Sequence, residues 1–443
     1  MPRKHIALLS AAALLGAGGW YGLGQGVGHG VGAGSGAGSA AAAAAPARPF
    51  GSHTFSYAPG TLRPTGNRAA LDRSVLAFYK KWKANFVKQN CGHGWYEVYA
   101  PDADHPYVAE AQGYGLVVTA LMAGADPDAK KIFDGILAYV LAHPSAGNSA
   151  LHAAEQDENC KSVNGSDSAT DGDLDIAYGL LLAHRQWGSS GARDYRALAK
   201  KRINAVKASE VHGATRLTKL GDWSSGRYDR MSRTSDWMPG HFKAFRKATG
   251  DPAWDAVLKN THTAIARLQS GYAPRTGLLP DFVVNTTTSP RPAKGKALED
   301  PHDGAYHWNA CRDPWRIGSD AVINGDAKSR AAARRMNAWV KAETGGNPGK
   351  VRAGYTLGGT GYGGADEPAF FAPFAVAAMT DPGSQAWLDA LWKKMLATSP
   401  GRTDYYATSV QLQSMLVVTT TTGRPEPPPP GRQPCAADGG GGT

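Results

Sequence analysis

The feature that most constrains the fold of this chain is a long succession of segments whose apolar residues recur with the period of an α-helix. Alternation typical of β-strands is scarce, and only 213–223 and 277–285 are typical of short hairpin strands in loops. The pattern predicts about twelve helices. They are expected at 67–89, 108–122, 127–141, 170–186, 194–209, 235–248, 252–270, 314–324, 327–343, 367–379, 383–397 and 405–417.

Consecutive helices joined by alternating short and long connections predict an all-α fold of six helical hairpins closed into a ring, an (α/α)6 barrel. The long loops would then gather at one end and build a cleft there. An irregular helical solenoid is the main rival, but no repeat of roughly 30 to 45 residues is visible. The 42% hydrophobic content supplies enough apolar material for a large core.

The two ends of the chain differ in composition from the rest. Residues 1–25 have a short basic start and an apolar run too short to span a bilayer comfortably. They predict a secretion signal, with an uncleaved N-terminal anchor as the alternative. Residues 26–47 are expected to form a Gly/Ala-rich linker, and residues 422–443 a disordered Pro/Gly-rich tail. We therefore expect one folded domain at 48–421 in a secreted, extracellular monomer without stable membrane insertion.

Charge and cysteines limit the partners. The net charge is +11, but Lys and Arg are scattered and not interleaved with aromatic residues, so nucleic acid is not an expected partner. The four cysteines match no zinc motif. Cys435 lies in the tail; Cys91 could pair with Cys160, or Cys311 could take part instead.

The stretch "ATDGDLDIAYGLLLAHRQWG" (169–188) places Asp171, Asp173 and Asp175 at alternate positions before an apolar helix. Such residues commonly cap a helix or favour the positive end of its dipole. A calcium loop does not fit, because its sixth and twelfth positions are Ile176 and Trp187 instead of Gly and a carboxylate.

The same stretch resembles the signature of glycoside hydrolase family eight, A-[ST]-D-[AG]-D followed by I-A and a small-apolar helix. Five further segments are similar to this family: "RPFGSHTFSYAPGTLRP" (48–64), "VAEAQGYGLVVTALMAG" (108–124), "RTSDWMPGHFKAF" (233–245), "WNACRDPWRIGSD" (308–320) and "DYYATSVQLQSMLVV" (404–418). The resemblance implies an (α/α)6 barrel, in agreement with the helix count. It also implies hydrolysis of β-linked glucans, xylans or chitosan with inversion at the anomeric carbon.

Inversion requires a carboxylic acid that protonates the leaving oxygen and a carboxylate that activates water. The resemblance identifies Glu110 as the acid, with a raised pKa. It places Asp171 where the family binds and helps to distort the sugar. Asp173 and Asp175 are expected to be structural, capping the helix or bonding loop amides.

The base is expected to come from a loop. Asn309 stands where one branch of the family carries an Asp base, and an amide cannot take the proton of water at ordinary pH. Another branch, with chitosanases and mixed-linkage glucanases, supplies a Glu from an inserted loop. Glu299 best matches that branch, with Asp300 and Asp303 as alternatives.

Sugar rings bury their apolar faces against aromatic side chains. The predicted substrate-binding residues are Trp95, Tyr114 and Trp237, with Asp236, Asn309 and Arg312 as polar contacts. No metal and no organic cofactor is implied, because proton transfer between carboxylates and water suffices.

These expectations describe an endo-acting hydrolase of β-1,4 linkages in a β-glucan, cellulose-like or mixed-linkage. A chitosanase of the same family is the alternative, although a body of net charge +11 is poorly suited to a polycation. A second alternative is a non-catalytic polysaccharide-binding protein. A third is a cell-envelope structural protein tethered through the Gly/Ala segment.

Overall fold

The computed structural model describes residues 45–419 of the chain. The predicted secretion signal, most of the Gly/Ala-rich linker and the predicted tail lie outside these described residues, so those predictions stay predictions. Within 45–419, no helix combines the length and the apolar character needed to cross a bilayer.

Residues 45–419 contain twelve α-helices, each within a few residues of a predicted segment. The even-numbered helices form an inner ring: α2 (Ala109–Leu121), α4 (Thr170–Trp187), α6 (Pro239–Thr249), α8 (Asp313–Asn324), α10 (Pro368–Ala378) and α12 (Tyr405–Val418). The odd-numbered helices lie outside it: α1 (Arg68–Phe86), α3 (Ala129–Ala142), α5 (Tyr195–Ser209), α7 (Ala253–Gly271), α9 (Ala327–Glu343) and α11 (Gln385–Ala397).

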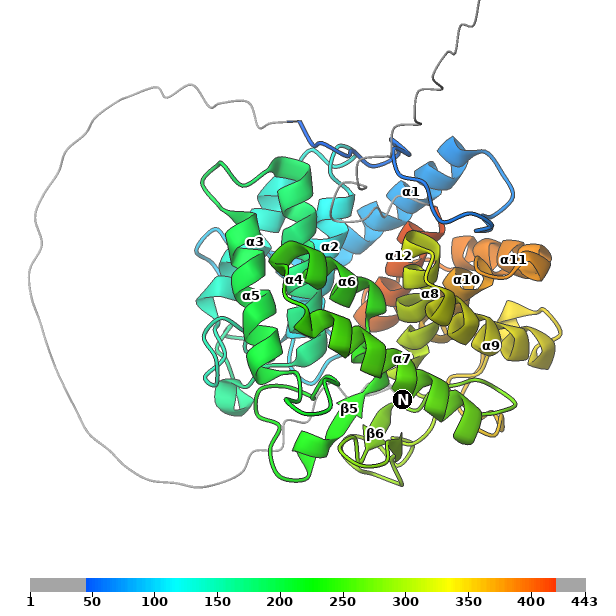
Figure 1. Cartoon of the computed structure of the whole chain (residues 1–443). Helices are drawn as coiled ribbons and strands as arrows, with labels where there is room; N and C mark the ends of the chain where they lie inside the picture. Colours follow the sequence, from blue (N-terminus) through cyan, green and yellow to red (C-terminus); the bar gives the residue numbers. More distant parts are fainter. Residues whose placement is uncertain (1–44, 420–443) are drawn as a thin grey trace, which may run out of the picture.

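Packing between these helices closes the ring (Figure 1). Each inner helix contacts the next inner helix, and α12 contacts both α10 and α2. Each outer helix packs mainly on one inner helix: α3 on α2, α5 on α4, α7 on α6, α9 on α8, α11 on α10 and α1 on α12. The fold is the predicted (α/α)6 barrel.

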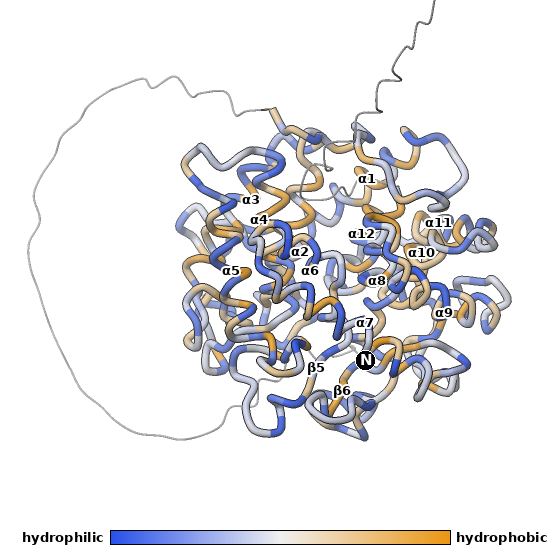
Figure 2. The backbone as a smooth tube through the Cα atoms, in the orientation of Figure 1, coloured by the Kyte–Doolittle hydropathy of each residue, from blue (hydrophilic) through white to orange (hydrophobic). Residues whose placement is uncertain are grey.

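Hydropathy explains which helices are inside. Every residue of α2 is buried, as is nearly every residue of α10 and α12. A helix that is apolar on all sides is stable only when other elements surround it. The outer helix α9 instead buries one face, and Figure 2 shows a mixture of hydrophilic and hydrophobic positions along it. The sequence pattern thus distinguishes α2, α10 and α12 from an outer helix such as α9.

Glycines allow α2 and α4 to approach closely. A Cβ atom added to Gly179 of α4 would lie 2.8 Å from the Cβ atom of Leu116 in α2, and one added to Gly113 would lie 2.8 Å from the Cβ atom of Asp175. No methyl group fits at these distances unless the helices separate. The contact matters because α2 and α4 carry Glu110 and Asp171.

Short strands connect the helices at their ends: β1 (Val87–Lys88) with β2 (Glu97–Val98), β3 (Tyr107–Val108) with β4 (Glu155–Gln156), and the antiparallel sheet β5 (Met231–Arg233), β6 (Phe282–Val284) and β7 (Arg291–Pro292). β6 confirms the strand predicted in 277–285. The strand predicted in 213–223 is wrong, since this segment forms only a bridge between Val211 and Thr218.

The segment before α6 also differs from the prediction. A helix was expected from Ser235, but residues 234–236 form the 3₁₀ turn η3 (Thr234–Asp236) and α6 begins at Pro239. Proline suits a first helical position and disfavours helical geometry in the residue before it. Met238 accordingly has ψ of 78°.

A disulfide joins Cys91 to Cys160. This pairing is one of those that the sequence left open. Cys311 is a buried free thiol, 3.0 Å from the carbonyl oxygen of Trp308. Cys435 lies outside the described residues.

We expect Gly179→Ala to lower the free energy of unfolding by about 1–3 kcal/mol, the usual cost of overpacking a close interface. Gly240→Ala in α6 is the matched control, because its added Cβ atom would find no atom nearer than 3.8 Å. Urea unfolding of both variants measures the difference. Equal stability of the two variants would contradict the close α2–α4 contact.

Candidate active site

The guanidinium of Arg312 is the centre of the candidate site. Arg312 ends the 3₁₀ turn η4 (Ala310–Arg312) that leads into α8, and it is 1% exposed. One terminal nitrogen donates to Glu110 at 2.5 Å and to Asp171 at 3.0 Å. The other donates to Ser235 and to the side-chain oxygen of Asn309, both at 2.9 Å. Four separate segments of the barrel therefore meet on one cation.

These residues share a position at the N-terminal ends of inner helices. Glu110 and Asp171 are the second residues of α2 and α4, and Tyr405 is the first residue of α12. No side-chain hydrogen bond caps the starts of α2, α4, α6, α8 or α10. The positive ends of the helix dipoles thus face the site and favour negative charge there.

Glu110 is almost completely buried. Burial raises its pKa to about 7, with Arg312 opposing the shift and the nearby charge of Asp171 adding to it. Its Oε2 atom accepts the short bond from Arg312, while Oε1 accepts only a long hydrogen bond, 3.4 Å, from the hydroxyl of Tyr405. Oε1 is therefore the oxygen available to carry a proton near neutral pH.

The pKa of Asp171 is shifted in the opposite direction to that of Glu110. Burial alone would raise the pKa of its carboxyl group, but the positive charges of Arg312 and Arg233 hold the pKa below its usual value. Its Oδ1 atom accepts from the amide of Gly172 at 2.9 Å. The site thus places a carboxyl group that retains its proton next to one that stays ionised.

A second carboxylate, Glu299, lies on the far side of Asn309 from Arg312. Its Oε2 accepts from the side-chain amide of Asn309 at 2.8 Å, and its Oε1 accepts from Arg233 at 2.7 Å. Glu299 is 6% exposed, and Arg233 is fully enclosed. Two side chains, Arg312 and Asn309, therefore stand between Glu110 and Glu299.

The alternatives Asp303 and Asp300 have other partners. Asp303 accepts the backbone amides of residues 297–300 at 2.7–3.1 Å and so folds the loop around itself. Asp300 accepts from the amide and from the ring of His302, both at 2.7 Å. Asp300, His302 and His307 form one of two groups among residues 45–419 whose atoms could hold a metal ion. The other group is His262, Asp320 and Asp326.

Asp281 holds the C-terminal end of the loop that carries Glu299. It precedes β6, and its oxygens accept the backbone amides of His307, Asn309 and Ala310 at 2.7–3.1 Å. Burial raises the pKa of Asp281 to about 7 in spite of these bonds. This residue fixes the position of Asn309, and the sequence analysis did not find it.

The structure corrects the roles predicted for two aromatic residues. Trp237 and Tyr114 are both completely buried, and Trp237 donates its ring N–H to Ser232 at 2.8 Å. Neither offers a face to a sugar. Trp95 is half-buried and packs against Tyr139 and His143, at the α3 side of the barrel.

Two half-buried aromatic residues, Trp308 and Tyr406, lie nearer to Arg312. Their ring centroids are 6.1 Å apart, and Arg312 lies 5.9 Å from the ring of Tyr406. Tyr406 was part of a quoted family segment, but its type alone did not distinguish it from core tyrosines. Trp308 begins the family segment 308–320 but was not among the predicted sugar-binding residues.

Asp173 and Asp175 are structural, as predicted, but neither caps α4. Asp173 pairs with the buried Arg202 and accepts the amide of His152 at 3.1 Å. Asp175 pairs with Arg316 and His241, and although burial works against it, Arg316 lowers the pKa of Asp175 to about 2. Both residues connect helices through ion pairs, which the sequence spacing did not reveal.

The comparison with known families decides the identity of this arrangement. The model of glycosyl hydrolases family 8 matches residues 68–421. The chain belongs to this family. It is a glycoside hydrolase, and family 8 enzymes act with inversion.

Relatives within family 8 cover most of the chain. A beta-glucanase of Niallia circulans is 43% identical over 374 residues, spanning 84% of this chain and 90% of the relative. An endoglucanase of Bacillus sp. (strain KSM-330) is 36% identical over 368 residues, spanning 81% and 78%. The apo structure of a beta-1,3-1,4-glucanase from Paenibacillus sp. X4 is 43% identical with a TM-score of 0.82, covering 85% of this chain and 99% of that one.

Asp236 differs from the sugar-binding role predicted for it. The residue is fully buried, and neither carboxyl oxygen has a hydrogen-bond partner among residues 45–419. Arg233 lies 3.8 Å away. Burial raises the pKa of Asp236 to about 7, against the attraction of Arg233. The side chain is therefore enclosed as a mostly neutral acid below this pH.

The raised pKa of Asp236 predicts how the free energy of unfolding depends on pH. In the unfolded chain the carboxyl group ionises near pH 3.8, whereas in the folded protein it keeps its proton to about 7. Between these values the folded state binds more protons, so Asp236 makes the free energy of unfolding fall as pH rises. We expect Asp236→Asn to remove this fall and to gain up to about 4 kcal/mol relative to the parent at pH 8, at about 1.36 kcal/mol per pKa unit.

The free energies of unfolding of the parent and of Asp236→Asn are measured by denaturant unfolding at pH 4, 6 and 8. Asp255→Asn is the control, because Asp255 is an exposed carboxylate of α7 that pairs with Arg246. A stability difference between parent and Asp236→Asn that stays constant with pH would contradict a neutral Asp236.

Proposed function

We propose that this family 8 enzyme is an endo-acting β-glucanase that cleaves β-1,4 linkages, with mixed-linkage glucan as its preferred substrate. The observation that carries the mechanism is the chain of contacts from Glu110 through Arg312 and Asn309 to Glu299. The beta-glucanase and the beta-1,3-1,4-glucanase, each 43% identical to the chain, support the choice of substrate.

Glu110 is the general acid of this proposal. Its proton resides on Oε1, because Oε2 is bonded to Arg312. Burial keeps the group protonated to near neutral pH, as a proton donor to a leaving glycosidic oxygen must be. When the proton leaves, Arg312 is already in contact with the carboxylate that forms and stabilises its charge.

Glu299 is the general base. Its two oxygens accept from Arg233 and Asn309, donors that suit a carboxylate and fix its orientation. Inverting enzymes separate their two carboxyl groups by roughly 6.5–9.5 Å, to leave room for a water molecule. The two side chains between Glu110 and Glu299 support a separation of this kind.

Asp171 contributes as a negative charge. It stays ionised beside Glu110 because Arg312 and Arg233 favour its charged form. A fixed carboxylate there stabilises the positive charge that develops on the sugar ring in the transition state. Trp308 and Tyr406, the half-buried aromatic residues nearest to Arg312, are the proposed sugar platforms.

The decisive experiment measures reducing-end release from barley β-glucan, carboxymethylcellulose, xylan and chitosan. We expect the fastest release from β-glucan. We expect Glu110→Gln and Glu299→Gln each to lower kcat about 10²–10⁴-fold, the usual contribution of a general acid or base. Glu343→Gln, at the exposed end of the outer helix α9, is the control and should keep parental activity.

Other results would change specific parts of the proposal. Parental activity in Glu299→Gln would contradict the assigned base and direct attention to Asp300 and Asp303. Faster release from chitosan than from any glucan would contradict the substrate. Binding of polysaccharide without release of reducing ends would favour the non-catalytic alternative.

We also propose that the protein is exported and acts outside the cell as a monomer. The apolar run after Arg3 and Lys4 supports export, as does the Cys91–Cys160 disulfide, because disulfides persist in oxidising compartments. The proposed polysaccharide substrates are also found outside the cell. Fractionation of a producing culture should place the activity in the medium, and retention in the membrane fraction would favour the anchor.

A further inference from the structure

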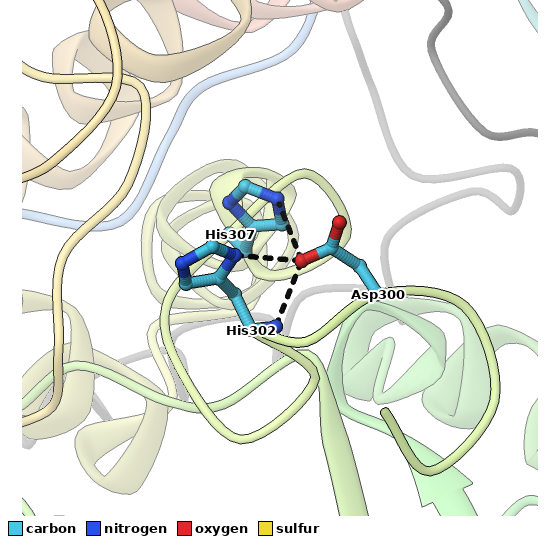
Figure 3. A group of neighbouring side chains, drawn as sticks. All are labelled: Asp300, His302 and His307. Atoms are coloured by element: carbon cyan, nitrogen blue, oxygen red, sulfur yellow. Dashed lines mark hydrogen bonds and ion pairs between the residues drawn. The ribbon is translucent and has the colours of Figure 1, made fainter. Parts of the chain in front are cut away.

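Three potential metal ligands gather on the loop that follows Glu299. The Oδ1 atom of Asp300 lies 2.7 Å from Nδ1 of His302 and 3.6 Å from Nε2 of His307, and these three atoms all lie within 4.8 Å of one another. Figure 3 shows both imidazole rings directed at the same carboxylate oxygen. None of the three residues has a part in the proposed proton transfers.

The second group of potential metal ligands among residues 45–419 already has a cationic side chain beside it. At His262, Asp320 and Asp326 the ammonium of Lys243 already lies 2.8 Å from both carboxylates. A built-in cation therefore satisfies that group. Among residues 45–419, no Lys or Arg forms an ion pair with Asp300, whose side-chain partners are the two imidazole rings.

The ligand types select a class of ion. Two imidazole nitrogens and one carboxylate oxygen suit zinc and similar first-row divalent ions, whereas calcium and magnesium prefer oxygen ligands alone. Ligands at about 2.0–2.2 Å from a tetrahedral zinc ion are roughly 3.4 Å apart. The separation of 3.6 Å is near this value, whereas the 2.7 Å hydrogen bond between His302 and Asp300 must open by about 0.7 Å to admit the ion, which the exposed side chain of His302 can do by rotation.

The surroundings orient the ligands and leave access from solvent. The hydroxyl of Tyr362 lies 3.4 Å from Nδ1 of His307, the nitrogen that does not face Asp300. The ring of Tyr362 also stacks on His302, with centroids 4.3 Å apart. Such outer contacts typically fix the tautomer and the ring position of a metal-binding histidine. The side chain of His302 is 47% exposed, which leaves a path for the ion.

We propose that Asp300, His302 and His307 form a binding site for a single zinc-class divalent ion that braces the loop carrying Glu299. The ion joins Asp300, which adjoins Glu299, to His307, two residues before Asn309. It thereby ties together both ends of the segment in which Asn309 bonds Glu299. Its role is to stabilise this loop, and the hydrolytic chemistry does not pass through it.

Calorimetric titration of the full chain with Zn²⁺ tests the site directly. The protein is prepared without an affinity tag, stripped with a chelator and titrated at pH 7.5, where imidazole is mostly neutral. We expect one ion per chain, and a rise in melting temperature when Zn²⁺ is present. We expect His302→Ala and Asp300→Asn each to weaken binding at least about tenfold and to abolish the rise.

His262→Gln is the matched control, since it alters the group occupied by Lys243 and should leave Zn²⁺ binding unchanged. Melting temperatures of the metal-free variants show whether each one is folded. Parental Zn²⁺ binding in both His302→Ala and Asp300→Asn would overturn the site. Displacement of Zn²⁺ by equimolar Ca²⁺ would overturn the ligand class.

Discussion

The structure depends on a single buried guanidinium, that of Arg312. A buried charge is costly unless its partners surround it, and Arg312 takes these partners from α2, α4, the turn before α6 and its own 3₁₀ turn. These segments are distant in sequence and meet only when the ring of helices is closed. The partners of Arg312 are therefore brought together only in the closed barrel.

The two halves of the site are built by different means. Glu110 and Asp171 stand on inner helices whose positions are fixed by apolar packing on all sides and by glycines at the α2–α4 contact. Glu299 stands on a loop whose apolar packing is limited to a small cluster that includes Leu298 and Ala293. Asp303 and Asp281 add networks of backbone hydrogen bonds, one at each end of the loop. Buried carboxylates thus supplement hydrophobic contacts in the loop, whereas the helices rely mainly on apolar packing.

Periodicity and apolar runs together predicted the helices well, because a half-buried helix such as α9 leaves a pattern of period 3.6 and a surrounded helix such as α10 leaves a long apolar run. The family motifs led to Glu110, Asp171, Glu299 and Arg312. Burial was the part that sequence did not predict: Trp237, Tyr114 and Asp236 lie in motifs yet are enclosed. Asp281 was missed for a related reason, since a single Asp after a proline carries no signal of the three amides it accepts.

The distribution of arginines explains how similar carboxyl groups acquire different roles. Arg312 is shared between Glu110 and Asp171, so Glu110 receives only part of one positive charge, and burial outweighs that part. Glu299 has Arg233 at 2.7 Å and an amide donor on its other oxygen. An Asp in place of Asn309 would put a second negative charge within hydrogen-bond distance of Glu299 and of Arg312. The neutral amide at 309 is thus the counterpart of a loop-borne Glu299, since it bonds the carboxylate and the guanidinium without competing for either charge.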